Sequence, residues 1–123
     1  MDYLSTAQKT EFFNKLRSRI DDGSLVWQAV GDSDHEFIIE TGNFLYSIAS
    51  VDDDGVPPVV FEIWALKKED KRLVADRLLE QITSDVFDTI TYNIVSIYKK
   101  AQRQVNQADK IAQEILEELD PKE

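Results

Sequence analysis

The last third of the chain carries one uninterrupted apolar stripe, and this feature constrains the fold more than any other. Its members recur at gaps of three or four residues, with a mean of about 3.6, which is the period of an α-helix. They are Ile90, Ile94, Ile97, Ala101, Val105, Ala108, Ala112, Ile115 and Leu119. No glycine or proline interrupts the stripe before Pro121, so the pattern predicts one long helix over Ser84–Leu119.

A helix of that length does not fit inside a domain of this size. At about 1.5 Å per residue it would measure roughly 54 Å. A compact chain of 123 residues has a radius of gyration of about 14 Å and hence a diameter of about 35 Å. The helix must therefore kink, wrap around the domain or meet a partner. Asn106 is its weakest point, so we expect residues 106–123 to form an extension that either protrudes or is kinked there.

The rest of the chain predicts an N-terminal helix followed by a sheet. Ser5 and Gln8 have the S-x-x-Q spacing of a capping box, and apolar residues at helical spacing follow, which predicts a helix over residues 6–21. Alternating apolar and aromatic residues, separated by turn residues such as Gly42-Asn43, then predict strands. The expected strands are Ser24–Val30, Glu36–Thr41, Phe44–Val51 and Val59–Leu66.

The segment Lys67–Ile82 is highly charged, and its apolar residues are spaced as on a weakly amphipathic helix. We expect Leu73, Leu78 and Ile82 to be its buried positions. The fold class that follows is α+β, in a single domain over residues 1–123. An antiparallel meander of three to four strands packs on the N-terminal helix and on the long C-terminal helix.

Composition argues against several classes of partner. The net charge of −10 repels phosphate backbones, so we expect no nucleic-acid partner, and the basic clusters Lys67–Arg72 and Lys99–Arg103 lack a nucleic-acid-binding context. No apolar run approaches the roughly 20 residues that span a bilayer, and no signal sequence is visible at the N-terminus. We therefore expect a cytoplasmic protein with no membrane partner. The absence of cysteine excludes disulfides and thiolate metal sites.

The combinations of side chains that enzymes use are scarce. His35 is the only histidine, and with Asp32, Asp34 and Glu36 it is better interpreted as a solvated turn than as a metal site. Glu62 lies in the middle of a strand and is either buried or solvent-facing. Four glycines leave no phosphate-binding loop. We therefore expect no enzyme, with no catalytic, cofactor-binding or metal-binding residues and no cofactor.

Three strings carry a resemblance to a known family: GSLVWQ, TGNFLYSIASVDDDGVPP, and SIYKKAQRQV followed by ILEEL. Their order resembles that of a family of small, uncharacterised bacterial proteins. These have an N-terminal helix, an antiparallel meander with a D-D-x-G-x-P-P-like turn, and a C-terminal helix with a Tyr-x-x-Ala pattern, matched here by Tyr98 and Ala101. The charged segment Lys67–Arg77 departs from this pattern. The resemblance implies a fold and no site residues.

Two functions from different classes are compatible with these patterns. The first is a non-enzymatic protein–protein interaction or adaptor module, whose long helix serves for self-association as a homodimer or for docking on a protein partner. Its expected interaction face is Val105, Ala108, Ala112, Ile115 and Leu119. The alternative is an acidic inhibitor, immunity protein or secretion-type chaperone that binds a basic or partly unfolded client, by analogy of size and charge.

Overall fold

A capped N-terminal helix opens the fold of this protein. The computed structural model describes residues 3–31, 33, 35–84 and 89–120. Helix α1 spans Thr6–Asp21, and its first turn is closed by the predicted capping box. The Ser5 hydroxyl accepts a hydrogen bond from Gln8 N at 3.1 Å, and Gln8 Oε1 accepts one from Ser5 N at 2.9 Å. These two bonds satisfy donors that the helix leaves unpaired, and the predicted helix is confirmed.

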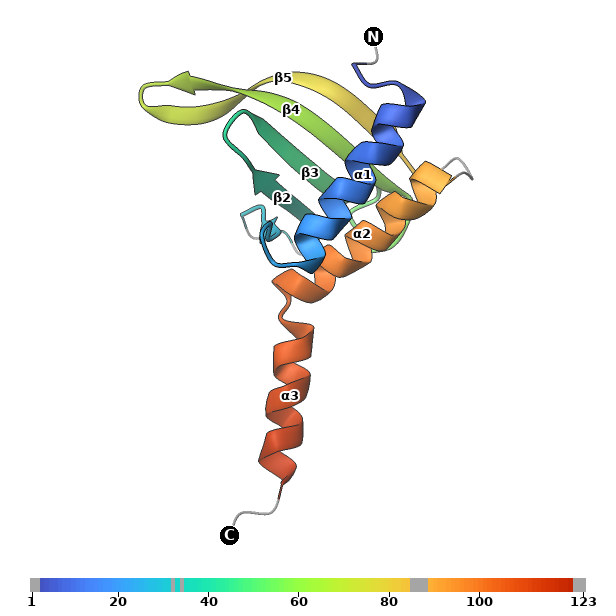
Figure 1. Ribbon diagram of the computed structural model, residues 1–123. Coiled ribbons are helices and arrows are strands. Elements are labelled where there is room, and N and C mark those ends of the chain that lie inside the picture. The colour runs from blue at the N-terminus through green and yellow to red at the C-terminus, as the bar shows by residue number, and fades with distance from the viewer. Residues whose placement is uncertain (1–2, 32, 34, 85–88, 121–123) are drawn as a thin grey trace.

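An antiparallel meander of five strands follows α1, rather than the three to four expected (Figure 1). The strands are β1 (Gln28–Ala29), β2 (Glu36–Glu40), β3 (Phe44–Ser50), β4 (Val59–Glu69) and β5 (Arg72–Thr83). Their order in the sheet is their order in the chain. The strand expected over Ser24–Val30 is reduced to the two residues of β1. Short connections bring each strand beside the next, as in other antiparallel meanders.

The helix predicted over Lys67–Ile82 is wrong, because this segment forms the end of β4 and nearly all of β5. Glu69 pairs with Arg72 across a two-residue turn, in which Asp70 and Lys71 have φ angles of 49° and 67°. Two consecutive positive φ angles match the twist of a hairpin, and the turn therefore returns the chain as a strand. The result is a long β4–β5 hairpin. Leu73 and Leu78, expected to be buried, are 41% and 37% exposed, whereas Ile82 is partly buried against the core.

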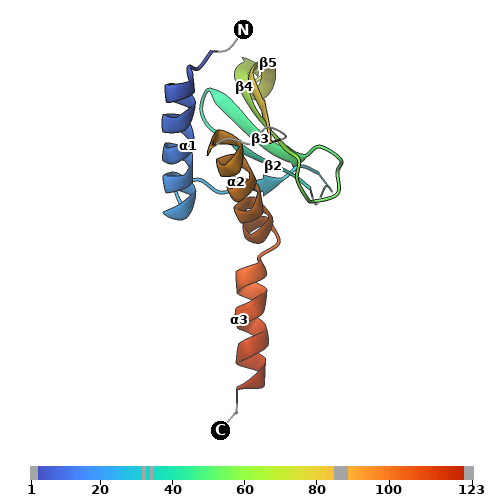
Figure 2. The ribbon, with the colours of Figure 1, turned by 90° about the vertical axis from the view of Figure 1, so that its right-hand side faces the viewer.

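The helices cover one face of the sheet only (Figure 2). Helices α1 and α2 (Thr89–Val105) lie on this face, and between them and the strands lies the hydrophobic core. Its largest fully buried side chains are Trp27, Tyr98, Phe13, Phe37, Phe61, Ile48, Ile94, Ile97 and Val59. Such a two-layer arrangement buries the apolar face of the sheet and the apolar stripes of both helices together.

The single long helix predicted over Ser84–Leu119 is wrong as well. Helix α2 ends at Val105, and a separate helix α3 spans Ala108–Leu119. Between them Gln107 adopts the left-handed conformation, with φ 54° and ψ 37°. A left-handed residue cannot continue a right-handed helix, so the axis changes direction at this point. The expected helix start near Ser84 adjoins residues 85–88, which lie outside the described residues.

Gly55, in the β3–β4 loop, has a φ angle of +78°, and a Cβ atom built there would lie 2.9 Å from Nδ1 of His35. Gly23 has a φ angle of +81° with nothing within 4 Å, which makes it a matched control for backbone strain alone. We expect Gly55→Ala to lower the free energy of unfolding by about 2–4 kcal/mol and Gly23→Ala by about 1–2 kcal/mol. Urea unfolding measures both, and equal losses would contradict the contact with His35.

Candidate functional site

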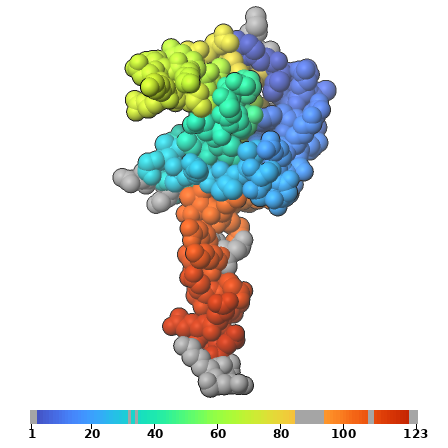
Figure 3. Space-filling view, turned by 60° about the vertical axis from the view of Figure 1, so that its left-hand side comes forward, coloured from blue at the N-terminus to red at the C-terminus, as the bar shows by residue number. Residues whose placement is uncertain are grey.

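Helix α3 stands clear of the globular part of the protein (Figure 3). Four large apolar side chains of α3 are exposed to solvent, and we call them the α3 face. They are Ile111 (48% exposed), Ile115 (54%), Leu116 (61%) and Leu119 (79%). Contiguous apolar side chains of this kind are typical of an interaction surface rather than of a solvated helix.

The interaction face predicted from the sequence is only partly the α3 face. Val105 belongs to α2, where it is partly buried against the core, and so it is not part of α3. Ala112 is exposed on α3, together with Ile115 and Leu119. The Ala108 side chain lies outside the described residues.

The apolar stripe predicted from the sequence does not include Ile111 and Leu116. Ile111 directly precedes Ala112 and Leu116 directly follows Ile115, so an apolar residue next to a stripe member was the sequence signal for both. Together the two residues widen the apolar surface of α3 to about 140° of its circumference, since successive residues are about 100° apart on a helix.

Charge makes α3 a poor helix in isolation. Glu114, Glu117 and Glu118 lie toward its C-terminal end, and its last turn holds no basic residue. Acidic side chains near a helix C-terminus interact unfavourably with the helix dipole. An isolated helix of 12 residues is also marginal in water. Both facts indicate that α3 gains stability when a partner covers its apolar face.

The last turns of α2 are fixed to the globular part by side-chain hydrogen bonds. Oε1 of Gln104 accepts a hydrogen bond from Trp27 N at 2.8 Å. Nε2 of Gln102 donates to the carbonyl oxygen of Gly55, also at 2.8 Å. The break at Gln107 therefore begins from an anchored point, which sets the direction in which α3 leaves the globular part.

Part of the helix-covered face of the sheet is covered by no described helix (Figure 1). One cavity of about 360 Å³ is lined mainly by apolar side chains, and a second of about 230 Å³ adjoins it. Phe12 and Tyr46 line both, and their ring centroids lie 5.3 Å apart, so the two cavities meet at this ring pair and together make one hollowed surface along α1. We call it the α1 groove; its other apolar side chains are Leu4, Leu16, Leu25, Phe44, Ile63 and Leu79.

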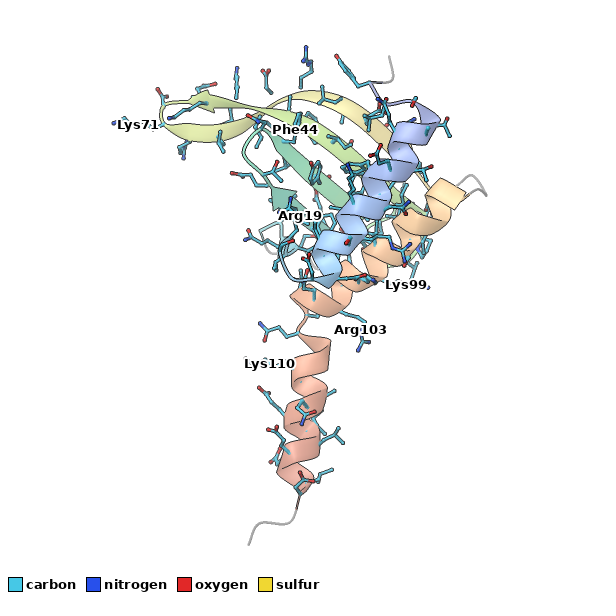
Figure 4. The ribbon with its side chains drawn as sticks, viewed as in Figure 1. Arg19, Phe44, Lys71, Lys99, Arg103 and Lys110 are labelled. Atoms are coloured by element: carbon cyan, nitrogen blue, oxygen red, sulfur yellow. The ribbon has the colours of Figure 1, made fainter. Side chains whose placement is uncertain are left out.

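Cationic side chains line the edges of the α1 groove. Lys15 and Arg19 come from α1, and Arg77 comes from β5. Figure 4 shows Arg19 and Phe44 on the same side of α1. Glu80 also lines the groove, but its carboxylate is buried, accepts a hydrogen bond from Leu4 N at 2.7 Å and lies 3.9 Å from Nζ of Lys9. Nζ of Lys15 also lies 3.1 Å from Oε1 of Glu11 on α1, so Lys15 is partly neutralised, while Lys15, Arg19, Arg77 and Glu80 together still give the lining of the groove a net positive charge.

Burial raises the pKa of Tyr46, whose ring lines the groove, and that of Tyr98 in the core. Both phenols are therefore neutral at physiological pH. The Tyr98 hydroxyl donates a hydrogen bond to the backbone oxygen of His35 at 2.9 Å. Neither tyrosine is placed as a charged catalytic group.

Glu62 and His35, the residues considered as enzymatic candidates, have different surroundings. Oε2 of Glu62 accepts a hydrogen bond from Nε2 of Gln81 at 2.8 Å on the neighbouring strand, and Glu62 is half-buried. Nδ1 of His35 has no hydrogen-bond partner among the described residues and lies close to Gly55. In the part of the chain that the structure describes, no group of three or more His, Cys, Asp or Glu side chains could hold a metal ion. Asp32 and Asp34 lie outside that part.

Comparison with known proteins gives no relative. No family profile matches the chain, and neither the curated proteins nor the solved structures contain a significant match. The resemblance to uncharacterised bacterial proteins therefore stays a prediction. Among the described residues, no helix is long and apolar enough to cross a membrane.

Proposed function

We propose that the protein is a non-enzymatic interaction module that self-associates through α3. The observation that carries this proposal is the exposure of Ile111, Ile115, Leu116 and Leu119 on a helix outside the globular part. A short helix with such a face is stabilised by covering its apolar side chains rather than by its own propensity. A second copy of the chain is the partner that is always present.

Covering the α3 face contributes a free energy of the same order as the cost of association. Fully burying a leucine or isoleucine side chain contributes about 1.5–3 kcal/mol, and each residue of the α3 face is about half exposed or more. Covering four such residues therefore contributes about 4–8 kcal/mol per helix, and about twice that for a symmetric pair. Association itself costs about 4–15 kcal/mol, so the surplus supports a reversible dimer.

A second candidate, the acidic inhibitor or chaperone, takes its support from the net charge of −10 and from the glutamates of α3. A basic client would pair with these carboxylates and would relieve the unfavourable charge at the helix end. The two candidates differ in one measurable respect. Self-association requires only the purified chain, whereas the inhibitor or chaperone function requires a client.

Sedimentation equilibrium of the full chain from about 1 to 200 µM tests the proposal, since the range brackets micromolar dissociation constants. We expect a reversible monomer–dimer equilibrium. Hydrogen exchange on the same samples should show amide protection in α3 that rises with protein concentration, because docking suppresses fraying of the helix. Protection of the sheet should not change. A chain that stays monomeric, with α3 unprotected over the whole range, would contradict self-association.

A further inference from the structure

Self-association through α3 requires a surface that receives it, and the globular part offers one. Resting on the proposed function, we propose that α3 of one copy lies in the α1 groove of a second copy, with Glu114 and Glu118 facing Lys15 and Arg19. Each of two copies can place its α3 in the α1 groove of the other, which gives a closed dimer. We call each of its two equivalent contacts between α3 and the α1 groove a junction.

The α3 face and the floor of the α1 groove are both apolar, and the width of the α3 face suits a groove. The α3 face spans about 140° of the helix, wider than the narrow seam of a two-stranded coiled coil. A helix with a wide apolar face is suited to a groove, in which both its sides as well as its centre are covered. The α1 groove has an aromatic and aliphatic floor, with Phe44, Tyr46 and Leu79 among its lining residues.

The lengths of helix and groove also correspond. Helix α3 has 12 residues and is about 18 Å long at about 1.5 Å per residue. Helix α1 has 16 residues and is about 24 Å long. The groove is lined by Leu4, just before α1 begins, and by Phe12, Lys15, Leu16 and Arg19 within α1. The distance from Leu4 to Arg19 along the chain, 15 residues, exceeds the length of the 12-residue α3.

The charges beside the α3 face are complementary to those of the α1 groove, which favours α3 as its occupant. Glu114 and Glu118 are four residues apart and flank the apolar face on the Ile111 side. Lys15 and Arg19 are also four residues apart and line the groove from α1. Because residues four apart lie one helical turn apart, each glutamate can face one cation when the two helices run side by side. The net charge of −10 disfavours association of two copies in general, so this local complementarity specifies where they meet.

The position of α3 favours a groove on another copy. In Figures 1 and 3 α3 points away from the globular part. The residues that line the α1 groove come mainly from α1 and the sheet. The hydrogen bond from Trp27 N to Gln104 holds the end of α2 from which α3 departs. Docking into the chain's own groove would require the helix to turn back at Gln107, and it would give a monomer.

Charge reversal on the full chain tests the junction. One variant carries Lys15→Glu and Arg19→Glu, and the other carries Glu114→Lys and Glu118→Lys. All four side chains are exposed, so both variants should fold. Each variant alone places like charges together at both junctions, and we expect its dissociation constant to rise about 10-fold or more. An equimolar mixture restores opposite charges at both junctions, and we expect a 1:1 heterodimer with wild-type affinity.

The control is the double variant Lys68→Glu with Lys99→Glu, which makes the same change in net charge away from the groove. Figure 4 shows Lys99 on the other side of the globular part from Phe44. This control should dimerise like the wild type.

Each other outcome identifies what failed. If the Lys15 and Arg19 variant dimerises like the wild type, the groove is not the acceptor, while self-association through α3 stands. If the wild type is a monomer whose α3 amides are protected at every concentration, α3 occupies its own groove and the second copy is excluded. A monomer with unprotected α3 amides would overturn the proposed function itself.

Discussion

Replacing Phe61 with alanine should lower the free energy of unfolding by about 3–5 kcal/mol, because a buried aromatic ring is lost and a cavity remains. Phe61 is fully buried on β4. Its ring centroid lies 5.0 Å from that of Phe13, 5.8 Å from that of Phe12 and 6.4 Å from that of Tyr46. These contacts join α1 to the sheet, so the substitution weakens the packing between the two layers. Thermal unfolding should shift down by roughly 10–20 °C.

Phe44→Ala is the matched control for Phe61→Ala. It removes the same ring from the neighbouring strand β3, where Phe44 is 40% exposed. We expect it to cost less than about 1.5 kcal/mol, because much of that ring is already in contact with water. Urea unfolding followed by circular dichroism measures both variants. Equal losses for Phe44→Ala and Phe61→Ala would contradict the placement of the core under α1.

Replacing Ile115 with glutamate should raise the dissociation constant of the dimer by about 100-fold or more, because a charge is placed at the centre of an apolar contact. Ile115 is 54% exposed and lies in the middle of the α3 face. Glutamate is a good helix former, so the substitution leaves α3 able to form. Sedimentation equilibrium measures the change.

Gln113→Glu is the control for Ile115→Glu, since it adds the same charge to α3. Gln113 is exposed, lies off the apolar face, and donates a hydrogen bond to Oε1 of Glu117 at 3.2 Å. We expect a change in the dissociation constant of less than about threefold, as for a substitution outside an interface core. Equal weakening by the two variants would indicate that added charge, rather than loss of the α3 face, weakens the dimer.

The local patterns of α1, β2 and β3 were sufficient to predict these three elements, whereas the strand predicted over Ser24–Val30 shrinks to the two residues of β1. The Ser5 and Gln8 capping box and the apolar spacing behind it predict the bounds of α1 to the residue, because particular side chains mark where this helix starts and ends. Strands β2 and β3 alternate regularly and are joined through Thr41–Phe44, where Thr41 N donates to the Phe44 carbonyl oxygen at 2.8 Å, although neither Gly42 nor Asn43 has the positive φ angle of a primed turn. For α1, β2 and β3 the local sequence preferences agree with the final fold.

Strand β5 could not be predicted in the same way, because two irregularities conceal its alternation. Ile63 pairs with Glu80 and Trp64 with Leu78, so one residue of β5 is extra, and a second irregularity follows between Ala65 and Leu66. Such bulges break the two-residue period. The apolar residues of β5 consequently fall at intervals that resemble a helix. The turn Asp70-Lys71 also lacks the glycine that marks most hairpins with positive φ angles.

Apart from the low helix propensity of Asn106, the break between α2 and α3 leaves no sequence signal, because residues 106–107 shift the helix axis without shifting the spacing of the apolar stripe. Neither residue is glycine or proline, and the left-handed conformation falls on Gln107. The α1 groove is a property of packing. It exists because α1 and α2 leave part of the sheet uncovered, and the sequence of any one element cannot show this.

The two edges of the meander have a consequence for how copies of this chain can meet. An exposed strand edge offers unpaired backbone groups that can join sheets of neighbouring molecules into open-ended aggregates. Here β1 has only two residues, while β5 is interrupted by bulges and carries Arg72, Asp76, Arg77 and Glu80. Short, irregular and charged edges are poor templates for further strands. Contacts between chains are thereby directed away from backbone pairing and toward side-chain surfaces, where an assembly can close on itself.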